Sequence, residues 1–272
     1  MSSVLIVSIL FLSALISGLA VFFVKRNNTN VLKLILAFSG AYLFAITVLH
    51  LIPHVYHSGT TSPEIIGLYI LGGFIFQLLL EQFSQGIEHG HIHHQENMRA
   101  FPFGIMISLC LHAFLEGMPL SAGHQNELVF GIAIHHIPAA FALGSLLINT
   151  KLTKQRIIIA LVVFAAMTPL GFMTSKGLSQ GAWGDVSQYF DKIMAVVIGI
   201  FLHISTTILF ESGSADHHKF NKKKMLAVLV GILVSLANFL FDGHNHSHAD
   251  GHSHELHEHN HDHDHDHDHS HD

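Results

Sequence analysis

A histidine and a carboxylate lie in a stretch of this chain that is otherwise typical of a membrane span. His112 and Glu116 are four positions apart in LHAFLEGMPL, residues 111–120. On a helix this spacing puts both side chains on one face, about one turn apart, where they can bind one ion or each other. A hydrogen-bonded pair that joins two helices would use the same residues. Taken alone, the pair leaves both interpretations open.

A second pair of candidate ligands lies in the next apolar run, AIHHIPAAFALG. His135 and His136 come just before Pro138, which lacks an N–H group and should disturb the helix there. Pro119 follows Glu116 in the same way. Ionisable side chains near the centre of a span cost at least ~2.5 kcal/mol each, so those present are expected to serve a function. The two pairs together predict a metal site beside irregular helix segments, as in many transporters.

The donor types favour one class of ion. The predicted metal ligands are His112, Glu116, His135 and His136. Three imidazoles and one carboxylate suit Zn²⁺ better than Mg²⁺ or Ca²⁺, although Cd²⁺, Fe²⁺, Mn²⁺, Co²⁺ and Ni²⁺ also accept these donors. Cys110 is the only cysteine, which excludes an internal disulfide and a thiolate cluster within one chain.

The elements that position these residues are membrane-spanning helices. The 272 residues are 50% hydrophobic and 12% charged, well below the usual charged content of about 25%. Backbone polarity in lipid forces each span to be helical. The apolar runs lie at about 4–24, 32–54, 64–85, 103–121, 127–149, 155–175, 191–211 and 223–241. We therefore predict an all-α membrane protein whose eight transmembrane helices form one domain, residues 1–241.

Basic residues predict the orientation of the helices, because Lys and Arg in short loops stay on the cytoplasmic side. Of the 13 basic residues, 11 fall in or beside the loops after the first, third, fifth and seventh helices. Only Lys176 and Lys192 lie in an even-numbered loop. Both termini are therefore expected outside the cytoplasm, and the plasma (inner) membrane is the expected location.

Two segments are rich in histidine, one on each predicted side. Residues 242–272 hold 13 histidines, nine acids and no Lys or Arg, a composition that predicts a disordered extracytoplasmic tail with many weak metal ligands. A solubilising tail or a purification tag is the alternative. The loop 86–100, predicted cytoplasmic, carries His89, His91, His93 and His94. These histidines would receive the ion or slow its uptake, or the loop is a simple linker.

Further ionisable residues lie nearer the ends of the predicted spans. His50, His54 and His57 would line one stripe where metal enters, or would be interfacial histidines satisfied by water. His203 is expected to form a hydrogen bond across helices rather than to bind metal. Glu81 and Glu211 are expected near the cytosolic boundary.

The motifs resemble those of a known family. HAFLEG and HHIPAA look like the paired HNxxEG and HExPHE-type signatures of the ZIP family of divalent metal transporters. Four more segments resemble parts of that family's second, third, sixth and seventh helices. They are VLHLIPH at 48–54, GFIFQLLLEQ at 73–82, MTPLG at 167–171 and GIFLHIS at 199–205. The resemblance covers nearly the whole chain.

The resemblance implies two inverted three-helix repeats around a central helix pair, with metal moving into the cytoplasm by alternating access. His112, Glu116 and His135 match family ligands, and His136 stands where the family often has an acid. The departures occur where the family commonly has polar or acidic side chains, at Ala113, Ala139 and Thr168. We therefore expect one transported ion, not two.

Two alternative classes are an intramembrane zinc-dependent hydrolase and a metal sensor. The chain has no HExxH motif, and Glu116 as a ligand would leave no obvious general base beside the site, so no enzyme is expected. A sensor would need an output domain, for which the short loops leave no room. The expected partners are divalent metal ions and the lipid bilayer; a homodimer is left open, and no nucleic acid is expected.

Overall fold

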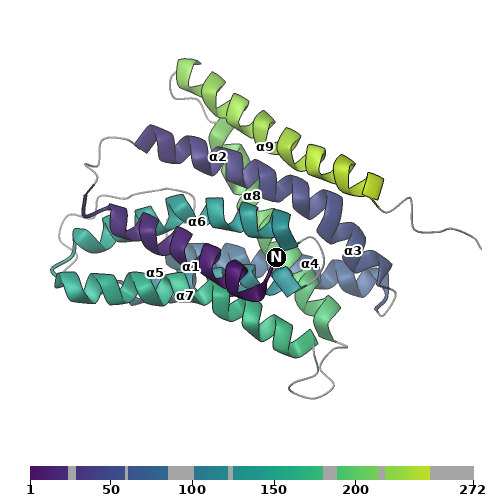
Figure 1. Ribbon diagram of the computed structural model, residues 1–272, viewed down its shortest axis with the longest axis horizontal. Helices are drawn as coiled ribbons and strands as arrows, with labels where there is room; N and C mark the ends of the chain where they lie inside the picture. The colour runs from purple at the N-terminus through teal and green to yellow at the C-terminus, as the bar shows by residue number, and fades with distance from the viewer. Residues whose placement is uncertain are drawn as a thin grey trace, which may run out of the picture.

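The computed structural model describes residues 1–23, 29–58, 61–84, 101–121, 125–179, 189–213 and 218–245. Within these ranges every regular element is helical (Figure 1). The long helices are α1 (Ser3–Ala20), α2 (Thr29–Ile46), α4 (Pro63–Ser84), α5 (Phe103–Gly117), α6 (Gln125–Ile148), α7 (Lys154–Ser179), α8 (Phe190–Gly213) and α9 (His218–Asn245). Eight segments are long and apolar enough to cross a membrane, which confirms the predicted all-α class and its number of spans.

Two of the predicted spans change helix type part-way along. The second span consists of α2, a π-helical segment η1 (Thr47–Leu51) and α3 (Ile52–His57). In the fourth span α5 gives way to a 3₁₀ segment η3 (Met118–Ser121) that contains Pro119. A proline cannot donate the usual helical hydrogen bond, so a change of helix type beside it is expected. By contrast, Pro138 lies inside α6, which continues to Ile148.

The helices pack in two groups that share a long boundary. Helix α1 packs along α6 and α7, and α5 packs along α7; in the other group α4 packs along α8, and α2 along α8 and α9. The boundary is formed where α2 meets α6 and where α4 meets α5. Figure 1 shows α2 and α9 on one side of the molecule and α5 and α7 on the other. The site helices α5 and α6 therefore lie at the boundary between the groups.

Glycines bring several backbones into direct contact. A Cβ atom on Gly73 of α4 would lie 1.9 Å from the Val196 carbonyl oxygen of α8, and one on Gly171 of α7 would lie 1.9 Å from the Phe114 oxygen of α5. Small residues at helix crossings permit such approach in membrane proteins. The crossings fix α5 against α7 and α4 against α8.

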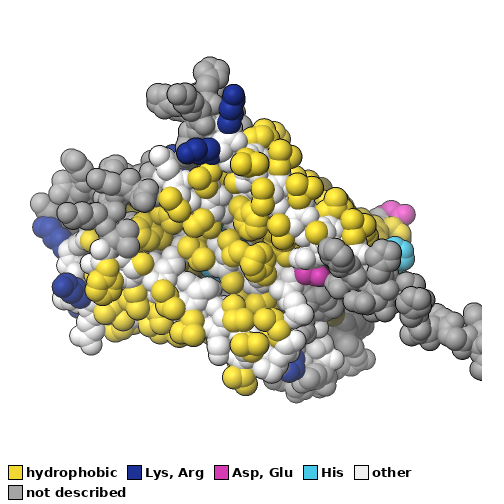
Figure 2. Space-filling model, turned by 45° about the horizontal axis from the view of Figure 1, so that its top comes forward, with side chains coloured by type: hydrophobic (Ala, Val, Ile, Leu, Met, Phe, Trp, Pro, Cys, Tyr) yellow, Lys and Arg dark blue, Asp and Glu magenta, His cyan; other side chains and the backbone are white. Residues whose placement is uncertain are grey.

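The outer surface is apolar, as lipid contact requires. In the most hydrophobic stretch of each helix, 83% of residues are buried in α6 but 17% in α9. Figure 2 shows hydrophobic side chains spread over the visible face, with Lys and Arg confined to its periphery. The chain is an integral membrane protein with α6 as its most buried helix.

Candidate metal centre

The four predicted ligands, from α5 and α6, lie together in the interior. His112 and Glu116 follow one another by one turn of α5, and His135 and His136 are neighbours on α6. All four side chains are buried, and Glu116 and His135 are fully inaccessible to solvent. The spacing accounts for each pair lying on one helix, and the fold brings the two pairs together in one site.

Three ligand atoms converge on one point. The Nε2 atom of His112 is 3.4 Å from Oε1 of Glu116, and Nε2 of His135 is 3.8 Å from the same oxygen. One donor atom from each of these residues lies within 4.8 Å of the other two. Two ligands of a tetrahedral zinc ion, each about 2.0–2.1 Å from it, are about 3.3 Å apart. Small side-chain shifts would therefore let the three atoms bind one ion.

The converging atoms lack other partners. Within the described part of the chain, His112 Nε2, Glu116 Oε1 and His135 Nε2 are buried and make no hydrogen bond. Buried polar atoms without a partner are costly, so natural proteins rarely keep them without a function. A divalent cation bound between these atoms would satisfy all three at once. The donor set thus fits a zinc-type ion.

His136 is engaged by the other oxygen of the carboxylate. Its Nε2 lies 2.5 Å from Oε2 of Glu116, and the Thr168 hydroxyl lies 3.3 Å from its Nδ1. If Nε2–H donates to the carboxylate, Nδ1 can accept the hydroxyl proton of Thr168. His136 thereby holds Glu116 with its Oε1 directed at His112 and His135. Its role as a fourth ligand stays a prediction.

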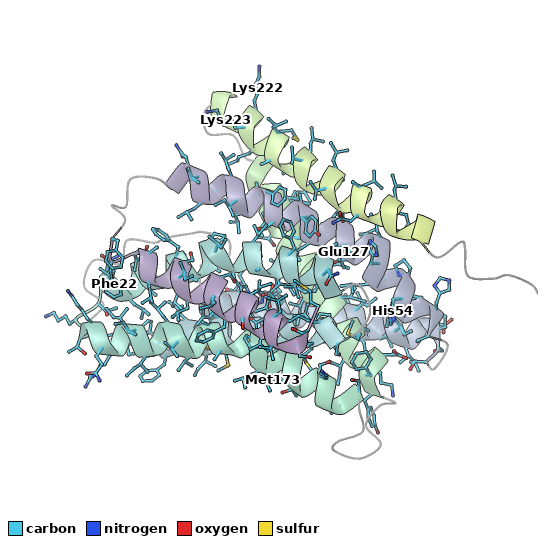
Figure 3. All side chains as sticks on the ribbon, in the orientation of Figure 1. Phe22, His54, Glu127, Met173, Lys222 and Lys223 are labelled. Carbon is cyan, nitrogen blue, oxygen red and sulfur yellow. The ribbon has the colours of Figure 1, made fainter. Side chains whose placement is uncertain are left out.

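The residues predicted along the entry route differ in burial, and their role there stays a prediction. His50 is buried in η1 with its ring edge-on to Phe239, whereas His54 and His57 are exposed on α3. His57 Nδ1 donates to the Pro53 carbonyl, 2.7 Å away. Figure 3 shows His54 at the end of the molecule where α3 lies. The loop histidines His89, His91, His93 and His94, and residues 246–272 of the tail, lie outside the described residues.

The expected hydrogen bond of His203 across helices is present. Its Nε2 lies 2.7 Å from Oε2 of Glu81 on α4, and its ring meets Phe74 edge-on. The side chain of Glu211 is not among those described.

Sequence reasoning missed one residue beside the site. Gln77 of α4 is fully buried, and its Oε1 lies 3.3 Å from Nδ1 of His112. The sequence feature that could have pointed to Gln77 is an amide within the apolar stretch GFIFQLLLEQ. A buried amide costs free energy unless it forms a hydrogen bond, so a polar partner was to be expected. Thr168 was recognised only as a position without a carboxylate, and its hydrogen bond to His136 was not foreseen.

Comparison with known proteins identifies the family. The family model described as ZIP Zinc transporter matches residues 1–101 and 88–238. The chain belongs to the ZIP zinc transporter family. This match confirms the resemblance seen in the motifs. It also confirms the prediction that the chain is a transporter of divalent metal rather than an enzyme, and that Zn²⁺ is its transported substrate.

Similar proteins come from several organisms. The chain is 30% identical over 215 residues to zinc transporter ZIP9 of Micropogonias undulatus, covering 70% of this chain and 67% of that protein. It is 29% identical over 205 residues to zinc transporter ZIP9 of Xenopus tropicalis, covering 66% of each. Protein zntC of Dictyostelium discoideum is 29% identical over 114 residues, which is 40% of this chain and 28% of that protein. The match thus spans about two thirds of the length of the ZIP9 relatives.

Proposed function

We propose that this chain carries Zn²⁺ into the cytoplasm, one ion at a time, through a site formed by His112, Glu116, His135 and His136. The observation that carries the proposal is the convergence of three buried ligand atoms that have no hydrogen-bond partner among the described residues. Glu116 supplies the negative charge that offsets the cost of removing water from the ion, and the imidazoles supply neutral donors. In this arrangement His136 keeps the carboxylate in place. To act as the fourth ligand, its Nε2 would have to lose its proton and leave Glu116 Oε2 for the ion.

A single ion is proposed because the neighbouring positions offer no further carboxylate. Ala113 and Ala139 are buried beside the site with methyl side chains, and the hydroxyl of Thr168 hydrogen-bonds His136. A second cation close to the first would be repelled by it, and a single carboxylate would not offset that repulsion. One net negative charge and neutral imidazoles also favour release, since transport requires that the ion leave the site.

The orientation of the spans is proposed from the distribution of basic residues, and inward transport from the resemblance to the family. We infer that the ends of α7 and α9 that begin with Lys154 and His218 face the cytoplasm, because Lys151, Arg156 and Lys222–Lys224 lie there. His50, His54 and His57 then lie on the entry side together with the His-rich tail 242–272, and the loop 86–100 lies on the exit side. We place the protein in the plasma (inner) membrane, surrounded by lipid. A homodimer stays a prediction.

Zn²⁺ flux into proteoliposomes tests this function. The intact chain would be compared with His112→Ala and His135→Ala, and with Ser145→Ala as a control for a buried change on α6 that lies outside the site. Each variant must elute as a folded, monodisperse protein in detergent. We expect flux from the intact chain and from Ser145→Ala and loss of flux from both histidine variants. Flux retained in either histidine variant would move the site elsewhere, and the absence of flux in the intact chain would contradict the transporter itself.

A further inference from the structure

One buried side chain touches the metal site from a helix that carries none of its ligands. Gln77 lies on α4, which packs on one side against α5 and on the other against α8. Its side chain is fully buried, and its Oε1 is 3.3 Å from Nδ1 of His112. This contact crosses the boundary between the two helix groups.

The contact selects one form of the imidazole. A side-chain carbonyl oxygen can only accept a hydrogen bond, so Nδ1 of His112 must carry the proton. In a neutral imidazole, Nε2 then keeps its lone pair. That atom is the one that lies 3.4 Å from Oε1 of Glu116. The opposite tautomer would direct an N–H group at the point where the ion binds.

We propose that Gln77 is a positioning residue for the transported ion, holding His112 in the tautomer and orientation that present Nε2 to it. This inference rests on the proposed function of the site. A partner on the far nitrogen of a metal-binding histidine raises its basicity and fixes its ring, and loss of such partners typically weakens metal binding about 10–100-fold.

The two imidazoles of the converging set differ in this respect. Nδ1 of His135 is buried and has no hydrogen-bond partner among the described residues. Of these two histidines, His112 is therefore the one whose ring is held by a side chain from outside the ligand helices. Gln77 belongs to the group of α2, α4, α8 and α9, whereas His112 lies on α5. The affinity of the site for the ion therefore depends on the position of α5 relative to α4.

Three substitutions test the role. Gln77→Met keeps the length of the side chain but removes the acceptor, whereas Gln77→Glu keeps an acceptor oxygen. Ser108→Ala is the matched control, since Ser108 donates to the Leu80 carbonyl at 2.7 Å in the same α4–α5 contact and does not touch a ligand. The KM for Zn²⁺ flux would be measured in proteoliposomes with free Zn²⁺ set by a metal buffer, so that ions held by the tail do not alter it.

The expected result is a KM raised at least tenfold in Gln77→Met and within about threefold of the intact chain in Ser108→Ala. In Gln77→Glu the KM should not rise, because the carboxylate still accepts from Nδ1 and its negative charge favours a bound cation. Where a variant gives no flux, the zinc-induced rise in melting temperature of the detergent-solubilised protein replaces KM, and the same order is expected. An unchanged KM in Gln77→Met overturns the proposal. So does an equal rise in all three variants, which would indicate packing alone. If His112→Ala is also without effect, the proposed function fails; if only Gln77→Met is without effect, the positioning role alone fails.

Discussion

At the scale of single residues, the site depends on a carboxylate whose two oxygens contact different residues. Oε1 of Glu116 faces His112 and His135, and Oε2 is held by His136. If Oε2 were not held, the carboxylate could turn and leave the ion with fewer donors. Orientation of ligands by neighbouring hydrogen bonds is a general property of metal sites. The chain of contacts from Thr168 through His136 to Glu116 provides it here.

The hydroxyl of Thr168 can be tested by an isosteric change. Thr168→Val removes the partner of His136 Nδ1 while keeping the shape of the side chain, leaving a buried nitrogen without its hydrogen bond. We expect a loss of about 1 kcal/mol or more in stability, seen as a lower melting temperature in detergent, and a KM for Zn²⁺ raised a few-fold. Thr207→Val is the control, because that hydroxyl bonds only a backbone carbonyl of its own helix, that of His203. Equal melting temperatures and equal KM values in the two variants would contradict this role.

The sequence predicted the converging residues for a definite reason. His112 and Glu116 are one helical turn apart, and ionisable side chains are so costly in lipid that their presence is informative. Thr168 and Gln77 are less informative, because a neutral polar side chain costs less to bury in a span than an ionisable one. Their contacts join residues 32 and 35 positions apart and exist only once α7 and α4 are packed against the site.

At the scale of helices, backbone contact decides which elements stay together. Gly73 of α4 and Gly199 of α8 face each other's helices so closely that a Cβ on either would lie 1.9 Å from a carbonyl oxygen, of Val196 or of Ile70. A contact of that kind cannot be relieved by rotating a side chain. The close contact of α4 with α8 therefore fixes the backbone near Gln77, which lies one helical turn after Gly73.

Adjacent glycines on α4 allow a matched test of this crossing. Gly73→Ala should lower the melting temperature in detergent, corresponding to about 1–3 kcal/mol, because the two backbones must separate. Gly72→Ala adds the same methyl group next door, where no atom lies within 4 Å, and should leave the melting temperature nearly unchanged. An equal change of melting temperature in both variants would contradict the close approach of the α4 and α8 backbones at Gly73.

Helix boundaries were predictable, but the changes of helix type were only partly so. A run of about 20 apolar residues predicts a span whatever it packs against, because the bilayer sets its length. Pro119 gave a correct signal for the irregular end of the fourth span. Pro138 lies inside α6, which stays one helix from Gln125 to Ile148, and the kink predicted there stays a prediction. A proline shows where a hydrogen bond is lost, but it does not by itself predict whether the helix changes type there.

At the scale of the whole molecule, the short connections determine that consecutive spans alternate in direction. They do not determine which helices pack together in each of the two groups. Consecutive spans must run in opposite directions, so the order of the loops gives the sidedness of each end. That α1 joins α5, α6 and α7 while α2 joins α4, α8 and α9 depends on contacts between segments far apart in the chain. Several of those contacts occur at glycines, which the hydropathy of the sequence does not single out.

The orientation of the molecule can be measured directly because Cys110 is its only cysteine. In a Cys110→Ala background, Ser62→Cys places one thiol at an exposed position before α4, and Thr153→Cys places one at an exposed position before α7. The excess of Lys and Arg around the second position predicts that it is cytoplasmic. A membrane-impermeant maleimide added to intact cells should therefore label Ser62→Cys at once and Thr153→Cys only after permeabilisation. The reverse pattern would contradict the proposed orientation of the spans. Both variants must retain Zn²⁺ flux for the labelling to report on the native topology.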